Sequence, residues 1–349
     1  MTELRWKLAG DTAGQGVFFS DEELVERHLG RGEYRGMEFL HVNARRIVNE
    51  VPKASRLPFR WTLNAFRGCS HACMYCFARP THEYLGLGIG EDFDRKVVVK
   101  VNAVERLRAE LGSPRWNGEP IAMGTNTDPY QRCEGRYHLT RGIVEVLAEA
   151  ANPFSVLTKS TLILRDLDLL ARAARRTSVR ANLSIGTLDE AVWRATEPGT
   201  PHPRRRVEAV GRLNAAGVEC GVLVAPVLPG ISDAPDQLAE VVDACVAAGA
   251  VSVTAVPLHL RPGVREHFLA WLAGNRPDLV GEYERRYRRA YLPGRDQEAV
   301  ADQVRRLVAA ARARHGPPRR AGRPVAPPPE RASARPAPGA PADQLALGL

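Results

Sequence analysis

The chain has 349 residues, of which 44% are hydrophobic, and a formal net charge of +9 from 49 basic and 40 acidic side chains. This length and apolar content are sufficient for a large folded core and exclude a chain dominated by disorder. The first residues, MTELRWKLAGDTAGQG, lack an apolar signal core, and no segment approaches the roughly 18 apolar residues of a membrane span. We therefore expect a cytoplasmic protein that does not associate with a membrane.

Residues 1–60 are expected to form an N-terminal extension without catalytic residues. The segment SDEELVERHLG has a helix-capping residue at Ser20 and a helix-stopping residue at Gly30, and this pattern predicts a helix. The segment MEFLHVNARRIVNEVP predicts a strand followed by a turn, and Ser55 to Pro58 predict a linker.

Residues 61–262 show short apolar strands that alternate with amphipathic helices. The strand segments are RWTLNAF, PIAMG, FSVLTKS, SVRANLSIG, VECGVLVAPVL and AVSVTAVPLHL, with a further strand-like stretch, KVVVKV, after the first. Such alternation predicts an α/β fold with a parallel sheet and right-handed crossovers. Ligand-binding side chains are then expected on the loops that follow the carboxyl ends of the strands.

The remainder of the chain is expected to be helical from residue 263 to residue 315 and disordered from residue 316 to residue 349, where nine prolines occur among 34 residues. One helical segment combines basic and aromatic residues: Tyr283, Arg285, Arg286, Tyr287, Arg288, Arg289 and Tyr291. It predicts either a solvated, salt-bridged helix, which is the simpler interpretation, or a basic aromatic face for nucleic acid.

The strongest chemical signal is the stretch NAFRGCSHACMYCFARPTHEY, in which Cys69, Cys73 and Cys76 form a C-x3-C-x2-C motif. Three clustered thiols favour a soft metal centre over a disulfide framework. A four-iron cluster held by three cysteines keeps one iron open for a small ligand with an amine and a carboxylate. The alternatives are a zinc site closed by His71 or Cys133, or three unrelated buried thiols.

This motif resembles that of the radical S-adenosylmethionine (SAM) superfamily, and residues 63–262 are similar to its spore photoproduct lyase-like branch. The resemblance implies a partial (β/α)6 TIM-like barrel. It also implies a [4Fe-4S] cluster on the three cysteines and reductive cleavage of SAM to a 5'-deoxyadenosyl radical. An electron donor such as flavodoxin or ferredoxin is implied as a partner.

The resemblance also suggests residues that contact SAM. Tyr75 occupies the aromatic position before the last cysteine, and a lysine and a serine follow or end later strands. The expected set is Tyr75, Asn126, Thr127, Asp128, Lys159 and Ser184. A plain turn at Asp128 and a solvated Lys159 are the simpler alternatives. Glu197 with the following arginines can reach substrate or hold its own loop by ion pairs.

Two positions depart from the lyases of this branch. Those lyases use a cysteine near the end of the second strand as hydrogen donor, where this chain has Thr125, and a tyrosine where this chain has Phe77. Cys133, flanked by Tyr130, is the nearby thiol that can replace the donor, and both are candidate catalytic residues.

The sequence therefore predicts an enzyme that abstracts hydrogen from a substrate, with nucleic acid as one candidate. The alternative is a non-catalytic, zinc-stabilised nucleic-acid-binding protein that uses the same cysteines and the basic aromatic helix. The sequence does not identify the substrate or the oligomeric state.

Overall fold

The computed structural model describes residues 22–52, 55 and 57–318, and two β-sheets organise this part of the chain. The larger sheet has the strand order β11-β10-β9-β8-β7-β4-β3. Its bounds are β3 Val48–Glu50, β4 Trp61–Leu63, β7 Ile121–Met123, β8 Phe154–Thr158, β9 Val179–Ser184, β10 Glu219–Val227 and β11 Val253–Pro257. From β4 to β11 every neighbouring pair is parallel, whereas β3 pairs with β4 in the antiparallel sense.

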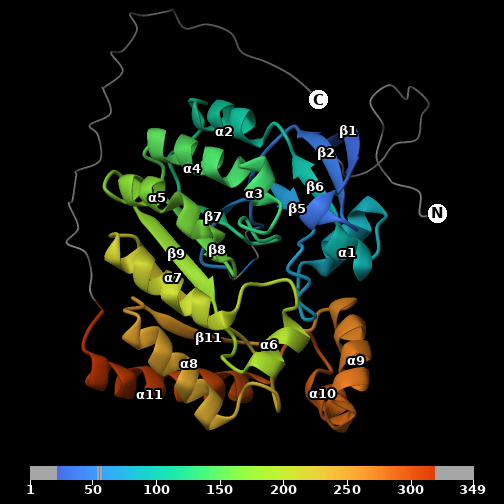
Figure 1. The fold of residues 1–349 in the computed structure, drawn as a ribbon, viewed down its shortest axis with the longest axis vertical. Helices are drawn as coiled ribbons and strands as arrows, with labels where there is room; N and C mark the ends of the chain where they lie inside the picture. The colour runs from blue at the N-terminus through green and yellow to red at the C-terminus, as the bar shows by residue number, and fades with distance from the viewer. Residues whose placement is uncertain (1–21, 53–54, 56, 319–349) are drawn as a thin grey trace, which may run out of the picture.

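Helices cover the outer face of this sheet (Figure 1). They follow the strands in the expected alternation, with bounds α2 Ala103–Leu111, α4 Leu139–Glu149, α5 Leu167–Ala174, α7 Pro203–Ala215 and α8 Pro235–Ala247. Shorter helical segments are α1 Glu91–Arg95, α3 Glu134–Tyr137, α6 Glu190–Thr196, η2 Arg79–Leu85 and η3 Thr161–Asp166. The six parallel strands and their helices form the partial (β/α)6 barrel expected from the sequence.

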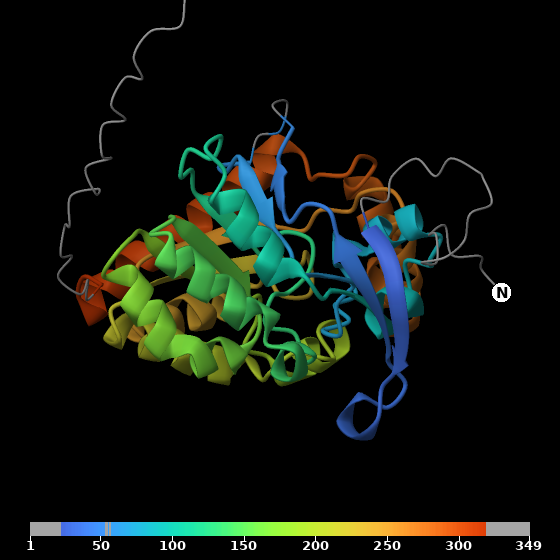
Figure 2. The same ribbon diagram turned by 90° about the horizontal axis from the view of Figure 1, so that it is seen from above.

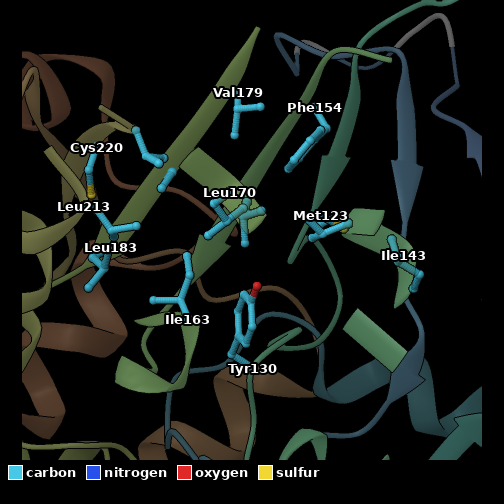
Figure 3. Close-up of a cluster of buried hydrophobic side chains, with 14 of the residues drawn as sticks. Met123, Tyr130, Ile143, Phe154, Ile163, Leu170, Val179, Leu183, Leu213 and Cys220 are labelled. Carbon is cyan, nitrogen blue, oxygen red and sulfur yellow. The ribbon is translucent and has the colours of Figure 1, made fainter. Parts of the chain in front are cut away.

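The main core lies between the sheet and these helices. Strand β7 is buried at all three positions, as expected for a parallel strand covered on both faces. Figure 3 shows part of this cluster, with Met123, Phe154, Ile163 and Leu183 directed into the same region. Continuous burial on both faces explains why the strand segments read as short apolar runs.

The smaller sheet has the order β1-β2-β6-β5, with bounds β1 Glu22–Leu29, β2 Glu38–Ala44, β5 Phe66–Arg67 and β6 Lys96–Lys100. The KVVVKV stretch forms β6 and therefore belongs to the smaller sheet, not to the main sheet. The short η1, Gly32–Tyr34, connects β1 to β2. Figure 2 shows β1 and β2 along one edge of the molecule.

The predicted helix from Ser20 to Gly30 is wrong. Residues 22–29 form β1, which pairs antiparallel with β2, and Ser20 lies outside the described residues. Pairing with a neighbouring strand supplies backbone hydrogen bonds that outweigh the local helical pattern.

The C-terminal part is helical, with α9 Val264–Asn275, η4 Pro277–Leu279, α10 Val280–Arg286 and α11 Gly294–His315. Tyr283 and Tyr287 are fully buried: Tyr283 packs against Phe268 and stacks on Tyr287. Arg286 pairs with Glu282. Tyr283 and Tyr287 therefore belong to a core and not to a surface face, whereas Tyr291 is 43% exposed. The predicted tail lies outside the described residues from residue 319 onward.

Across residues 22–52, 55 and 57–318, no helix combines the length and the apolar composition that crossing a bilayer requires.

Candidate active site

The three cysteines of the motif lie on one tight loop between β5 and η2. Cys69 and Cys73 are buried and Cys76 is half-buried. The Ala72 N–H donates to the Cys69 carbonyl at 3.2 Å, and the Cys76 N–H donates to the Cys73 carbonyl at 3.2 Å. Ala72 adopts a left-handed conformation with φ of 53°. The loop brings the thiols close together, because Cys73 and Cys76 raise the pKa of Cys69 and Cys76 raises the pKa of Cys73.

Arg79, three residues after the last cysteine, holds the loop from within. Its side chain is fully buried and donates to the Cys73 carbonyl at 3.1 and 2.9 Å and to the Ile89 carbonyl at 2.9 Å. Asp94 balances the charge at 2.8 Å, and the guanidinium lies 5.2 Å from the Phe93 ring centroid. The sequence reasoning missed this residue, although an arginine directly after a cysteine loop was a visible signal.

The segment after α6 packs against the other side of the loop. The Met74 N–H donates to the Thr196 carbonyl at 3.0 Å, and the Gly199 N–H donates to the His71 carbonyl at 3.0 Å. A Cβ atom on Gly199 would lie 2.1 Å from the Ser70 carbonyl oxygen, so only glycine permits this approach.

Thr127 joins the loop after β7 to the backbone before the first cysteine. Its hydroxyl donates to the Gly68 carbonyl at 2.6 Å, and the Gln131 amide donates to the same carbonyl at 3.0 Å. The Gln131 oxygen accepts from the Ser70 N–H at 3.0 Å. The Thr127 side chain is thus hydrogen-bonded within the protein itself. No sequence pattern pointed to Gln131.

Asp128 connects the same loop to the end of β8. Its carboxylate accepts from the Thr158 hydroxyl at 2.6 Å, from the Lys159 N–H at 2.7 Å and from the Tyr130 N–H at 2.9 Å, and it lies 3.3 Å from His71 Nδ1. Burial by itself raises the pKa of Asp128, but His71 and the donors outweigh burial and lower it.

Lys159 and Ser184 meet at the carboxyl ends of β8 and β9, as the sequence led us to expect. The Lys159 ammonium donates to the Ser184 hydroxyl at 2.6 Å, to Glu197 at 3.0 Å and to the Ala225 carbonyl at 3.1 Å. It also lies 5.5 Å from the centroid of the Tyr75 ring. Lys159 is therefore a fixed positive charge beside the cysteine loop rather than a solvated side chain.

Glu197 joins these groups through two ion pairs. One carboxylate oxygen accepts from Lys159 and from the Tyr75 hydroxyl, and the other lies 2.5 Å from the fully buried Arg206. Burial raises the pKa of Glu197, but Arg206 and Lys159 outweigh it and hold the pKa well below the usual range. Of the two roles that the sequence left open, the buried contacts favour ion pairing within the protein. We call Tyr75, Lys159, Ser184, Glu197 and Arg206 the Glu197 network.

Cations act on two of the three thiols, Cys73 and Cys76. Burial raises the pKa of each of the three thiols, so the unbound cysteines are protonated at neutral pH. Asp128 adds to this effect at Cys69 and Glu197 adds to it at Cys73. Lys159 acts against it at Cys73 and Cys76, and Arg79 also does so at Cys76. These cations favour the thiolate forms that an iron–sulfur cluster requires.

The two candidate catalytic residues lie elsewhere. Cys133 and Tyr130 are both 0% exposed and belong to the main apolar core. Figure 3 shows Tyr130 beside Ile163 and below Met123. The structure therefore does not place either residue on an accessible surface beside the cysteine loop.

Three polar or aromatic side chains near the loop are exposed. Asn126 is exposed at the end of β7, and its backbone N–H donates to the Asn64 side chain at 3.2 Å. Phe77 directly follows the last cysteine and is 49% exposed, and Tyr84 in η2 is 66% exposed. Aromatic side chains in such positions are available to contact a ligand.

Comparison with known proteins places this geometry in a family. The model of the radical SAM superfamily matches residues 63–242. An uncharacterized protein of Mycobacterium tuberculosis is 47% identical over 81% of this chain and 84% of its own length. A radical SAM Nalpha-GlyT isomerase of Pseudomonas phage M6 is 26% identical over 47% of this chain and 32% of its own length.

Solved structures of spore photoproduct lyase share the fold. A form complexed with dinucleoside spore photoproduct matches with a TM-score of 0.56 and 17% identity, over 78% of this chain and 79% of the lyase. The fold likeness agrees with the branch that the sequence resembles.

The family match contradicts the alternative of a non-catalytic zinc module, because the matched family is one of enzymes. Its members work with a [4Fe-4S] cluster and SAM, and the buried thiols described above fit such a cluster. Since the family model covers more than half of the chain, the protein belongs to the radical SAM superfamily.

Proposed function

We propose that Cys69, Cys73 and Cys76 hold the [4Fe-4S] cluster and that SAM binds beside it, at the carboxyl ends of the parallel strands. The single observation that carries this proposal is the position of the three thiols. They lie on one loop whose Tyr75 ring is 5.5 Å from the ammonium of Lys159, and this ammonium lowers the pKa of Cys73. Residues 61–262 would form the catalytic core, with residues 263–315 packed against it.

The bound cluster and SAM together supply the 5'-deoxyadenosyl radical that removes hydrogen from a substrate. The chain's own residues position these groups. Lys159 contributes positive charge near the thiols and can attract the SAM carboxylate, while Ser184 offers a hydroxyl beside it. Tyr75 provides an aromatic surface whose hydroxyl is fixed by Glu197.

Within the loop after β7, the three residues expected to contact SAM divide into two roles. The Thr127 hydroxyl donates to the Gly68 carbonyl beside the cysteine loop, and the Asp128 carboxylate accepts from the Lys159 N–H after β8. We therefore assign Thr127 and Asp128 as positioning residues. Asn126 is exposed and remains the member of this set that we propose for direct contact with SAM.

Cys133 and Tyr130 are assigned a supporting role in the core. A hydrogen donor must reach the substrate radical, and a thiol that is fully buried among apolar side chains does not meet this condition without rearrangement. Their burial therefore argues against a role as hydrogen donor. This agrees with the absence of the donor cysteine at Thr125 and of the tyrosine at Phe77.

We propose nucleic acid as the substrate class. Phe77 and Tyr84 present exposed aromatic rings beside or shortly after the cysteine loop, and unpaired bases stack on such rings. The formal charge of +9 attracts a phosphate backbone. The solved lyase that shares this fold is complexed with a dinucleoside spore photoproduct.

Anaerobic reconstitution tests the catalytic proposal. Protein loaded with iron and sulfide, then given SAM and reductant, should release 5'-deoxyadenosine. Flavodoxin or ferredoxin would supply the electron in a reducing cytoplasm. If the protein forms no four-iron cluster, or releases no 5'-deoxyadenosine, the proposed function is wrong.

Binding to oligonucleotides tests the substrate class separately. Affinity for single-stranded DNA or RNA should fall steeply as salt rises, because phosphate contacts release counterions. Phe77→Ala should weaken binding by about 1–3 kcal/mol, the usual contribution of one stacked base, whereas the exposed Leu29→Ala serves as control. Absence of binding at low salt rejects nucleic acid but leaves the radical chemistry intact.

A further inference from the structure

We propose that Glu26, His28 and His41 bind a divalent transition-metal ion. These residues lie on the β1–β2 ribbon, which forms one edge of the molecule (Figure 2). The site is separate from the cysteine loop and does not depend on the function proposed above.

The strand register gathers the three side chains on one face of the ribbon. Glu26 pairs directly with His41 across the two antiparallel strands, and His28 pairs with Phe39. Because alternate residues of a strand point to the same side, His28 shares the face of Glu26. Directly opposed side chains on an antiparallel pair are close neighbours, which brings in His41.

The distances between the side chains approach those of a coordinated ion. Glu26 Oε2 lies 2.9 Å from His28 Nε2, and the ring centroids of His28 and His41 are 4.2 Å apart. One ligand atom from each residue lies within 4.8 Å of the other two. Ligand atoms around a tetrahedral zinc ion, with bonds of about 2.1 Å, are about 3.4 Å apart. Small side-chain rotations would therefore complete the site.

His41 is held in place by a hydrogen bond from a neighbouring element. Its Nε2 atom lies 2.8 Å from the hydroxyl of Tyr137, the last residue of α3. Metal-binding histidines usually have such a partner, because the second contact fixes the orientation of the ring. Tyr137 thus provides a contact that the ribbon alone would not supply.

The charges near the site set an upper limit on affinity. Glu26 brings one negative charge, while the Arg136 guanidinium lies 5.4 Å from the Tyr137 ring centroid. Arg27 neighbours Glu26 in sequence but pairs with Glu38, on the other face of the ribbon. We therefore expect moderate affinity, with Kd on the order of 1–10 µM.

The ligand types identify the class of ion. Two imidazoles and one carboxylate suit zinc and neighbouring first-row transition metals, whereas calcium and magnesium prefer oxygen ligands. Glu26 is exposed and the histidines are half-buried, so an ion can enter from solvent and keep water as a further ligand. A bound ion would join β1 to β2 and, through Tyr137, to the region of α3.

Zinc binding to the full chain tests the proposal. The protein is first loaded anaerobically with its iron–sulfur cluster, so that the cysteine thiols are occupied, and is then dialysed against Zn²⁺. Elemental analysis should find one zinc per chain in addition to iron. Zinc X-ray absorption should show only nitrogen and oxygen ligands at about 2.0–2.2 Å, without sulfur at about 2.3 Å.

Variants on the same ribbon separate the site from non-specific binding. Glu26→Gln and His28→Ala should each weaken zinc binding by at least about 10-fold, whereas Glu38→Gln should bind as the wild type does. At zinc concentrations near 100 times Kd, the wild type should gain about 3–5 °C in Tm and the first two variants should gain little. The proposal is overturned if the wild type binds no zinc below about 100 µM. Sulfur ligation of the zinc, or equal binding by all three variants, would also overturn it.

Discussion

Two groups of cysteines can be compared within this one chain: the loop thiols of Cys69, Cys73 and Cys76, and the core thiols of Cys133, Cys220 and Cys245. Burial raises the pKa of the thiols in both groups. The groups differ in their neighbours. Lys159 lowers the pKa of Cys73 and Cys76, and Arg79 also lowers that of Cys76, whereas burial with Glu134 or another thiol raises the pKa of the core thiols Cys133 and Cys220. Cys69 resembles the core group, because burial, Asp128 and the other two loop thiols raise its pKa. Burial alone therefore does not mark a metal-binding thiol, and a nearby positive charge distinguishes two of the three loop thiols from the core group.

The largest expected effect separates the two groups directly. Cys73→Ala should abolish the cluster, so that iron content falls well below four atoms per chain and 5'-deoxyadenosine formation falls by at least about 100-fold. Cys220→Ala is the matched control, because this thiol is equally buried but lies in the apolar core. Retention of the cluster by Cys73→Ala would contradict the assignment of the loop thiols.

The next effect concerns the charges around the loop. Glu197→Gln leaves the fully buried Arg206 and the largely buried Lys159 without their shared carboxylate, and should cost about 3–5 kcal/mol in the free energy of unfolding. The control is Glu190→Gln, which removes an exposed pair with Arg194 and should cost less than about 1 kcal/mol. Denaturant unfolding of the three proteins measures both values, and equal losses would show that the network contributes no special stability.

The same carboxylate predicts a dependence of stability on pH. The folded pKa of Glu197 is depressed below its ordinary value of 4.5. Its contribution is therefore complete above pH 4.5, and it is lost as the pH falls from there through the folded pKa. The wild type should lose more stability than Glu197→Gln between pH 5 and pH 3, in unfolding curves measured at each pH. A parallel loss in both proteins would assign acid sensitivity to other carboxylates.

Lys159→Met tests whether a positive charge next to the loop matters for cofactor chemistry. Removing this charge should lower 5'-deoxyadenosine formation by about 10–100-fold, which is the usual effect of a residue that supports a metal site. Lys96→Met is the control, since Lys96 forms an ion pair with Asp92 in α1. Unchanged turnover with normal iron content in Lys159→Met would show that the loop thiols need no cation from β8.

Gly199→Ala tests the mechanical support of the loop group. The new methyl group would meet the Ser70 carbonyl oxygen, so we expect a loss of about 1–3 kcal/mol and weaker cluster retention. Gly274→Ala in α9 meets no atom within 4 Å, and should instead be neutral or stabilising by up to about 1 kcal/mol. Thermal unfolding and iron analysis of both variants measure the difference.

The smallest effect is expected in the core group. Cys133→Ala removes one buried sulfur atom, should cost about 1 kcal/mol in stability and should leave 5'-deoxyadenosine formation and substrate turnover unchanged. A variant that forms 5'-deoxyadenosine normally but loses substrate product would instead restore Cys133 as a hydrogen donor.

Several features were predictable from local sequence. The cysteine motif depends on spacing within eight residues, and the six parallel strands follow from short apolar segments separated by amphipathic helices. The proximity of Lys159 and Ser184 also followed, because residues at the carboxyl ends of neighbouring parallel strands share one edge of the sheet.

Other features required the tertiary structure, because they depend on partners far apart in the chain. The β1 segment carries a helical pattern, but pairing with β2 makes it a strand and places Glu26 opposite His41. Tyr283 and Tyr287 stand among several arginines, a pattern that predicts an exposed helix face. In the structure, however, both tyrosines are buried in a core that includes Phe268.

The sequence by itself determined that three thiols stand within eight residues, and this local spacing carries the resemblance to the radical SAM superfamily. Only the tertiary structure decided what surrounds them. Glu197 lies 38 residues from Lys159 and 122 residues from Tyr75, and it is the fold that joins the three. Contacts between residues so far apart in the sequence depend on how the strands and loops assemble, and the local sequence pattern does not predict them.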